Sequence, residues 1–349
     1  MSKRVRIGLI GAGQNTCEKH IPGFQAIDGV EIVAVANRNV ESANAVAAQY
    51  NIPKVYETWQ QLLADNDIDA VVIGTLPNLH CEITCAALEA GKHVLVGSVM
   101  ARNLAEARQM KQAAKKHPKL IARIVPSPFG LISGPSVEHM LKGHFIGDLR
   151  EIVVLGVTSD FWDYSTPKVW RQDAEIVGND LLHLGFLQET LQRWAPNPVQ
   201  VFAQTELFEP TRPVPEESRF AEVNVPDSVQ ILAELQGGTR AIYHLSGIAL
   251  YGPGTQIHFY GSRGTVKIQF RDGDERLFAA RSGDEELKEL QIPDEDRQGW
   301  RVEQDFIDSI HGEKKVGLPD FSAGTKVMEF LEAVKLSATE NEPVSLPLE

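Results

Sequence analysis

Cysteine is scarce in this chain, which has only three in 349 residues: Cys17, Cys81 and Cys85. Three thiols are too few for a disulfide scaffold and fit a reducing compartment. Cys81 and Cys85 stand four apart in an expected helix, with no second pair to complete a tetrahedral set. We interpret them as helix-packing residues and predict no metal site.

Long apolar runs are also missing, because no stretch reaches the roughly 18 residues that span a membrane. The start, Met1–Ile7, goes directly into alternating apolar positions without the continuous apolar stretch of a signal peptide. These absences predict a cytoplasmic protein with no membrane partner.

Positive charge is in deficit, since 34 Lys and Arg face 47 Asp and Glu for a net charge of −13. Such a balance repels polyphosphate backbones, so we expect no nucleic-acid partner. The composition, 43% hydrophobic and 23% charged, is typical of folded proteins. A length of 349 residues exceeds the roughly 250–300 at which one core stops growing, which predicts two domains.

The first domain, residues 1–125, alternates short apolar runs with helical patterns such as Val40–Tyr50 and Leu104–Lys116. This alternation predicts an α/β Rossmann domain with a doubly wound parallel sheet. Its expected strands are Val5–Ile10, Glu31–Ala36, Ala70–Ile73, His93–Val96 and Ile121–Val125.

The second domain, residues 126–349, has longer and more consecutive strand patterns, which predict an α+β domain with a large, mostly antiparallel open sheet. Its last helix is expected over Ala323–Ser337, and the acidic stretch Asp272–Glu289 is expected to form a solvated hairpin. The expected strands are Leu149–Thr158, Pro198–Phe208, Val229–Leu235, Arg240–Ser246, Gln256–Tyr260 and Thr265–Phe270.

A glycine-rich turn follows the first strand and opens a helix. Gly11 permits the tight turn, and Gly13 lets the backbone approach a pyrophosphate that the helix N-terminus then meets. Thr16 replaces the third glycine of the fingerprint, which we expect to reduce the closeness of helix and strand. The run Gly11 to Thr16, with Gln14 and Asn15, predicts cofactor binding; a plain tight turn is the alternative.

At the end of the second strand stand Asn37 and Arg38, where a carboxylate would hold a bare ribose hydroxyl. A guanidinium pairs with a 2′-phosphate, so the sequence favours NADP over NAD. The alternative is a surface arginine beside an amide that binds the bare ribose.

Further motifs extend the pattern along the chain. They are Gly74–His80, Gly91–Leu95, Gly143–Gly147, Trp170-Arg171, Gly261–Thr265 and the segment Ala323–Ser345. With these motifs the whole chain resembles the Gfo/Idh/MocA family, named for glucose-fructose oxidoreductase and inositol dehydrogenase. The resemblance implies oxidation or reduction of sugars, polyols or related hydroxy compounds, and a homodimer or homotetramer formed through the open sheet. It also implies cofactor contacts from Thr75, Pro77, Asn78, His80, Gly97, Trp170 and Arg171. For His80 the alternative is a cap of the next helix.

The sequence departs from the family where the chemistry occurs. Gly97-Ser98-Val99 replaces Glu-Lys-Pro, so Ser98 stands at the position of the family lysine. His183-Leu184-Gly185-Phe186-Leu187 replaces Asp-x-Gly-x-His, so aspartate and histidine are absent too. Oxidising a carbinol needs a base for its hydroxyl proton, and His183 is the ionisable group left on that helix face. It is either a relocated base or a helix histidine satisfied by hydrogen bonds.

Other polar residues have mainly structural interpretations. Asn179 and Asp180 are expected to cap a helix, and Glu189 with Arg193 to form a salt bridge. His20 is expected at the surface of the first helix. Asp163 and Tyr164 either face a substrate or pack on the sheet.

Three functions fit these features. The first is an NAD(P)-dependent oxidoreductase acting on a carbohydrate-like small molecule with a non-standard acid-base set. The second is a cofactor-binding regulator that lost catalysis, since folds outlive functions. The third is a nicotinamide-dependent lyase or hydrolase with no net redox change. The apolar strand Ala241–Leu245 favours an oligomer in every case, because a whole sheet face of this kind would leave a large exposed patch.

Overall fold

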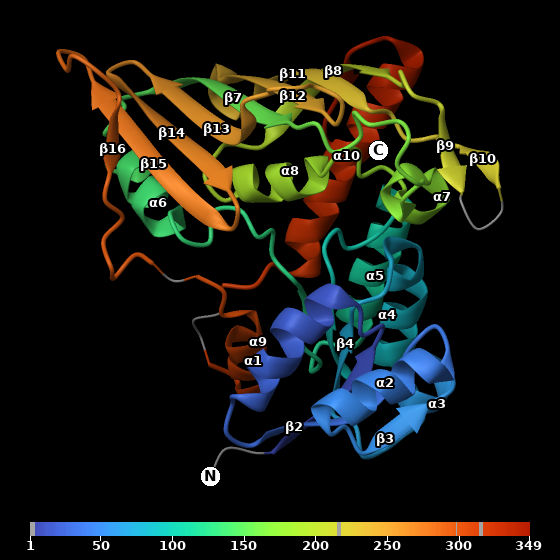
Figure 1. Ribbon diagram of the computed structural model, residues 1–349. Coiled ribbons are helices and arrows are strands. Elements are labelled where there is room, and N and C mark those ends of the chain that lie inside the picture. The colour runs from blue at the N-terminus through green and yellow to red at the C-terminus, as the bar shows by residue number, and fades with distance from the viewer. Residues whose placement is uncertain (1–3, 215–217, 298, 314–316) are drawn as a thin grey trace. The chain divides into compact units, whose positions relative to one another are not determined.

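The computed structural model describes residues 4–214, 218–297, 299–313 and 317–349. Two compact units make up the chain (Figure 1). Unit 1 comprises Met1–Pro126 and Arg301–Met328, and unit 2 comprises Ser127–Trp300 and Glu329–Glu349. No helix in the described part of the chain has both the length and the hydropathy needed to cross a membrane.

Unit 1 is built on a six-stranded, all-parallel sheet in the order β3-β2-β1-β4-β5-β6. The predicted Rossmann fold is therefore confirmed. The strand order reverses between β1 and β4, and the carboxyl ends of strands at such a point form the usual ligand crevice. The strands are β1 (Val5–Ile10), β2 (Val30–Ala36), β3 (Lys54–Tyr56), β4 (Ala70–Ile73), β5 (His93–Val96) and β6 (Ala122–Ile124).

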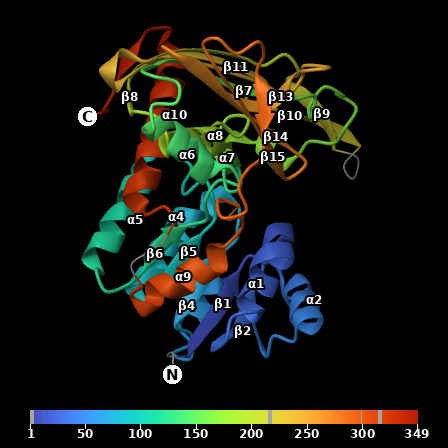
Figure 2. The same ribbon diagram turned by 90° about the vertical axis from the view of Figure 1, so that its left-hand side faces the viewer.

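Helices cover both faces of this sheet (Figure 2). Local signals define them: the Asn39 side chain accepts the Ser42 N–H at 2.9 Å to cap α2, and Asn103 caps α5 in the same way. The helical elements are η1 (Thr16–His20), α1 (Ile21–Gln25), α2 (Val40–Tyr50), α3 (Trp59–Leu63), η2 (Pro77–Leu79), α4 (His80–Glu89), α5 (Leu104–Lys116) and α9 (Val302–His311).

Unit 2 is built on a nine-stranded sheet in the order β16-β15-β14-β13-β7-β12-β11-β8-β17. Its pairs are antiparallel apart from β7 with β12, which confirms the predicted mostly antiparallel sheet. The strands are β7 (Leu149–Val157), β8 (Pro198–Glu206), β11 (Ser228–Leu235), β12 (Arg240–Ser246), β13 (Gly254–Gly261), β14 (Gly264–Arg271), β15 (Asp274–Arg281), β16 (Lys288–Leu290) and β17 (Val344–Ser345).

One face of the large sheet is packed. Tyr243 contacts Phe330 of α10 at a ring separation of 5.4 Å, and its hydroxyl donates to Gln188 of α8 at 2.7 Å. The remaining elements of the unit are α6 (Gly134–Lys142), η3 (Trp170–Gln172), α7 (Ala174–Val177), α8 (Leu184–Gln192), β9 (Thr211–Val214), β10 (Arg219–Glu222) and η5 (Gln236–Gly238). α10 (Phe321–Glu340) contributes to both units.

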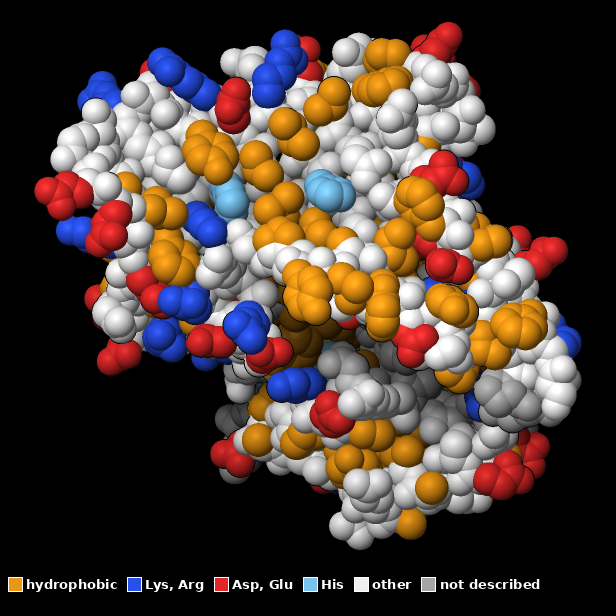
Figure 3. Space-filling model, turned by 45° about the horizontal axis from the view of Figure 1, so that its top comes forward, with side chains coloured by type: hydrophobic (Ala, Val, Ile, Leu, Met, Phe, Trp, Pro, Cys, Tyr) orange, Lys and Arg blue, Asp and Glu red, His pale blue; other side chains and the backbone are white. Residues whose placement is uncertain are grey.

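The opposite sheet face carries exposed apolar side chains, including Leu232 (56% exposed) and Ile242 (49%). Figure 3, with the top of the molecule turned forward, shows hydrophobic and histidine side chains gathered there. The register aligns one row across the sheet: Phe202, Leu232, Ile242, Val153, His258, Lys267 and Phe278.

The structure differs from the sequence expectations in three places. β3 is a sixth strand, which the sequence does not predict because three residues are too few to show a strand pattern. β15 lies inside the acidic stretch and places Leu277 and Ala279 in the core, so one face of this strand is buried and the alternate residues, such as Arg276, stay solvated. Residues 301–328 return to unit 1, although the predicted boundary assigns them to the second domain. The return rests on tertiary contacts such as Phe24 with Phe306, whose rings lie 6.4 Å apart, and local patterns do not encode such contacts.

Candidate functional site

The glycine turn after β1 has the geometry that a pyrophosphate needs. Gly11 has φ +82°, and a Cβ there would lie 2.7 Å from the backbone nitrogen of Thr75, so only glycine fits. A Cβ on Gly13 would meet nothing within 4 Å. The turn therefore presents open space at the N-terminus of a helix, where backbone N–H groups are free to bind an anion.

Thr16, which replaces the third glycine of the fingerprint, packs against the end of β4. Its hydroxyl donates to the Gly11 carbonyl at 3.3 Å, and its side chain is 2% exposed. A Cβ on Gly74 would lie 2.3 Å from the Thr16 Oγ1. Gly74 therefore leaves the space that the Thr16 side chain occupies.

Three polar residues at the end of β2 have different roles. Asn37 Oδ1 accepts the Ala12 N–H at 2.6 Å, so this amide holds the glycine turn. Asn39 caps α2. Arg38 is exposed, and its guanidinium has no hydrogen bond or ion pair with the described part of the chain.

Two side-chain oxygens at the carboxyl edge of the sheet are buried without a hydrogen-bond partner among the described residues. They are Thr75 Oγ1 and Asn78 Oδ1, in the loop after β4 that also contains Pro77. Leaving a buried hydroxyl or amide unpaired costs roughly 1–3 kcal/mol, so such atoms call for an explanation. Together with the open space at Gly13, they fit a dinucleotide whose polar groups would complete these hydrogen bonds.

His80 links the loop after β4 to the loop after β5. Its ring is 1% exposed, with Nε2 at 3.0 Å from the Thr75 carbonyl and Nδ1 at 2.9 Å from the Val99 carbonyl. Burial lowers the pKa of His80, opposed by these backbone acceptors. A Cβ on Gly97 would lie 3.3 Å from the His80 ring, so Gly97 lets the ring lie against the second loop.

Ser98, predicted from the sequence to stand at the position of the family lysine, follows Gly97 and precedes a cis peptide bond to Val99. Its side chain is half-buried. A serine hydroxyl without an adjacent base is a weak proton acceptor, so the local chemistry of this loop does not replace a lysine.

His183 in unit 2 has an unusual backbone. It is the N-cap of α8 with φ 63° and ψ 22°, and the preceding Leu182 also has positive φ (50°). Two successive non-glycine residues in this region hold roughly 1–3 kcal/mol of strain each, which is typical of functional sites. The His183 ring stacks on Phe186 with centroids 5.7 Å apart.

The same histidine lines a pocket within unit 2. The pocket has a volume of about 40 Å³, and Leu187, predicted from the sequence to stand at the position of the family histidine, lines it too. The other lining residues supply hydroxyl, carboxyl and apolar surface: Phe129, Gly156, Thr158, Asp160, Phe161, Leu182, Ser246 and Thr255. His183 and Leu187, four positions apart, therefore line the same pocket.

Charges around the pocket act on His183 in opposite directions. Burial, followed by the Arg171 guanidinium, lowers the pKa of His183, whereas the carboxylates of Asp180 and Asp160 raise it. The net direction is downward, so the imidazole is neutral at neutral pH and has a lone pair to accept a proton. Arg171 lies over the ring of Trp170, with its Cζ 4.3 Å from the ring centroid, and burial lowers its pKa.

The structural interpretations of the neighbouring residues are largely confirmed. Asp180 Oδ1 accepts the Gly185 N–H at 2.7 Å and so caps α8, whereas Asn179 donates to Glu332 at 2.9 Å instead of capping. Arg193 Nε pairs with Glu189 at 3.2 Å.

The loop near Asp163 is not packed on the sheet, since Tyr164 is 64% and Trp162 51% exposed. Asp163 accepts hydrogen bonds from the backbone and the hydroxyl of Ser165 at 2.9 and 2.6 Å.

The expectation for His20 is wrong. Its side chain is 2% exposed, and Nδ1 lies 2.6 Å from Glu303 Oε1 on α9. The residue lies in a π-helical turn, Thr16–His20, which alters the helix face that a regular α-helix would present. The sequence carries no local signal for a partner 283 positions away.

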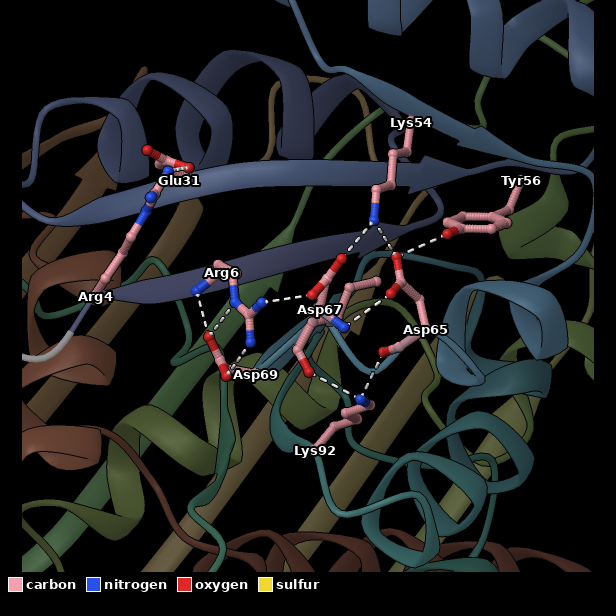
Figure 4. Close-up of polar contacts among 10 residues, drawn as sticks. Arg4, Arg6, Glu31, Lys54, Tyr56, Asp65, Asp67, Asp69 and Lys92 are labelled. Carbon is pink, nitrogen blue, oxygen red and sulfur yellow. Dashed lines mark hydrogen bonds and ion pairs between the residues drawn. The ribbon is translucent and has the colours of Figure 1, made fainter.

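The amino edge of the same sheet carries a second polar cluster, shown in Figure 4. Arg6 Nε pairs with Asp69 at 3.0 Å and Lys54 Nζ with Asp65 at 2.7 Å. Lys92, 5% exposed, donates to the carbonyls of Asp65 and Ile68, each at 2.8 Å. These charges are matched within the protein, so the cluster is structural.

The fold and the glycine turn define a class of protein: a dinucleotide-binding parallel sheet combined with a second unit built on a large open sheet. The chain belongs to the GFO/IDH/MocA oxidoreductase family. Residues 5–123 match its NAD-binding Rossmann fold and residues 136–267 match its C-terminal domain.

Individual relatives agree with this assignment. An uncharacterized oxidoreductase of Rhizobium meliloti is 30% identical over 58% of this chain and 60% of its own length, so the match spans less than two thirds of that relative. Trans-1,2-dihydrobenzene-1,2-diol dehydrogenase of Xenopus laevis is 27% identical over 68% of this chain and 67% of its own. Levoglucosan dehydrogenase, solved in complex with NADH and L-sorbose, shares the fold with a TM-score of 0.87, 21% identity and 99% coverage of both chains.

Proposed function

We propose that this chain is an NADP-dependent oxidoreductase that moves a hydride to or from a sugar, polyol or related hydroxy compound. The observation that carries the proposal is the neutral, pocket-lining His183 in a chain whose other unit has an open glycine turn. A bound nicotinamide supplies the hydride acceptor or donor. Levoglucosan dehydrogenase, with its sugar ligand, supports a carbohydrate-like substrate.

In this proposal His183 takes the hydroxyl proton while the carbinol carbon loses its hydride, which leaves a carbonyl product. Thr158, Ser246 and Asp160, which line the pocket with His183, supply hydrogen-bonding groups for substrate hydroxyls. The volume of about 40 Å³ is room for about three water molecules, so the pocket suits one hydroxyl-bearing end of a substrate.

Single-turnover kinetics on His183→Ala test this role. With any sugar that a screen finds active, we expect hydride transfer to slow by about 10²-fold or more and NADP affinity to stay unchanged. His139→Ala, which removes a side chain 77% exposed on α6, is the matched control and should be as fast as the parent. A His183 variant as fast as the parent removes His183 from the mechanism. A cofactor-loaded parent that is inert to every substrate favours the regulator.

The pH profile gives an independent readout. Because burial and Arg171 lower the pKa of His183, the rate should rise with pH through a limb below the ordinary histidine value of about 6.5. Asp160→Asn removes a carboxylate that raises this pKa, so its limb should move to lower pH. If the limb does not move in this variant, Asp160 does not influence the pKa of the titrating base.

The NADP preference rests on Arg38, which is exposed and unpaired among the described residues while Asn37 holds the glycine turn. A charge-assisted pair with the 2′-phosphate is worth about 1.5–3 kcal/mol, or roughly ten- to a hundredfold in affinity. Calorimetric titration of NADP and NAD into the parent, Arg38→Ala and the control Lys115→Ala should show preference lost only in the Arg38 variant. Equal affinities in the parent would contradict it.

We also propose that the protein is a homodimer or homotetramer assembled through the exposed face of the large sheet. In the row of aligned residues on this face, Leu232 and Ile242 are neighbours on adjacent strands, between Phe202 and Val153. Light scattering should give a mass at least twice the 38.5 kDa of one chain, and Ile242→Lys should lower it. A parent of 38.5 kDa would contradict the proposal. The cytoplasmic location stays a prediction from the sequence.

A further inference from the structure

A buried hydrogen bond joins two helices of unit 1 that lie far apart in the sequence. His20 (2% exposed) lies in η1, and Glu303 (4% exposed) lies in α9, with Nδ1 and Oε1 2.6 Å apart. Gly23 makes room for this carboxylate, because a Cβ there would lie 2.7 Å from Glu303 atoms. A buried carboxylate persists when it is hydrogen-bonded, so the contact is a built feature of the fold.

The hydrogen bonding continues from His20 to the glycine turn. Asn15 Nδ2 lies 3.4 Å from His20 Nε2. The two residues are five apart, and the π-helical turn at Thr16–His20 brings such positions onto one face, which a regular α-helix would not do. The carboxylate of Glu303 can only accept, so Nδ1 carries the proton and Nε2 accepts from the amide of Asn15.

Asn15 therefore donates to His20, and His20 donates to Glu303. Asn15 is exposed, two positions after Gly13, at the start of the helix. Holding its amide nitrogen towards His20 turns its carbonyl oxygen the other way and fixes the first helical turn, whose N–H groups would meet a pyrophosphate. Glu303 lies two positions after Arg301, where the chain returns to unit 1 from unit 2, so α9 supplies this carboxylate from within unit 1.

We propose that His20 and Glu303 are positioning residues for the dinucleotide, acting through Asn15 on the phosphate-binding turn. The inference rests on the proposed cofactor binding. Residues outside the glycine motif then contribute part of the affinity for the cofactor.

A double-mutant cycle on the full chain tests this inference, with NADP affinity measured by calorimetry and apo stability by thermal unfolding. Asn15→Ala and Glu303→Gln should each weaken NADP binding by roughly tenfold, the size expected for a charge-assisted hydrogen bond. The double variant should be no weaker than Asn15→Ala, because Glu303 acts through Asn15. Asp308→Asn makes the same charge change on α9 and is the control, with affinity within about threefold of the parent.

The outcomes are separable. If the parent binds neither NADP nor NAD, the proposed function fails. If the parent binds and Glu303→Gln weakens binding equally with and without Asn15, the pair is merely structural and the inference is overturned. If Glu303→Gln does not fold, the exposed Asn15→Ala still decides, because an affinity equal to the parent's overturns the inference.

Discussion

The two ends of the parallel sheet in unit 1 use polar residues in opposite ways. At the amino end, Lys92, Arg6 and Lys54 find partners in the loop 65–69 (Figure 4). At the carboxyl end, Thr75 Oγ1 and Asn78 Oδ1 are buried without a described partner, and a Cβ on Gly13 of the turn after β1 would meet nothing within 4 Å.

The difference shows where a fold stabilises itself and where it stays incomplete without a ligand. A satisfied polar network adds rigidity, whereas an unsatisfied one lowers the stability of the unliganded protein. Under the proposed function, a bound dinucleotide would pair with these oxygens and remove the penalty. Substitutions at the two edges should therefore separate stability from affinity.

The largest effect is expected for Gly13→Val. A valine side chain would enter the open space beside the turn, where its Cβ meets nothing within 4 Å. NADP affinity should fall by at least about a hundredfold, since the pyrophosphate loses its helix N-terminus. The apo melting temperature should change by less than about 2 °C, because the site is exposed. A variant that binds NADP normally would place the pyrophosphate elsewhere.

The opposite pattern is expected for Lys92→Met at the amino edge. The variant leaves the carbonyls of Asp65 and Ile68 buried without their donor. At about 1–3 kcal/mol for each unpaired group, the melting temperature should fall by roughly 5–10 °C. NADP affinity should stay the same, and Lys115→Met on the exposed end of α5 should change neither. A loss of affinity in Lys92→Met would show that the edges are coupled.

A smaller effect is expected for Asp65→Asn, and it depends on pH. The Lys54 ammonium, the Asp67 N–H and the Tyr56 hydroxyl hold the pKa of Asp65 well below its usual range. A folded-state pKa below the unfolded value of about 3.9 stabilises the protein above that pH, and the contribution is lost as pH falls further.

In urea unfolding the parent should exceed Asp65→Asn in stability at pH 7, and the gap should narrow between pH 5 and 2.5. Asp67→Asn, at a side chain 67% exposed, is the control with a nearly constant difference. A gap that widens towards low pH would contradict the role of Asp65.

Periodicity and motif spacing were enough to predict the strands β1, β4 and β5, the helices α2 and α5, and the glycine turn, because local residue patterns determine these features. β3 was not predicted, because three residues are too few to show the alternation of a strand. His20 was misplaced because its burial depends on Glu303, a partner that only tertiary packing reveals. The unpaired oxygens of Thr75 and Asn78 could not be predicted from the sequence either, because whether a polar atom has a hydrogen-bond partner depends on the folded chain.

Thr75→Val tests most directly the claim that the carboxyl edge is left incomplete for a ligand. It removes an unpartnered buried hydroxyl, so the apo melting temperature should rise by about 1–3 °C while NADP affinity falls about five- to thirtyfold. Thr84→Val is the matched control, because Thr84 Oγ1 in α4 is also buried without a described partner. It should raise the melting temperature similarly and leave affinity unchanged. A Thr75→Val variant that melts lower than the parent, or binds NADP equally well, would contradict the account.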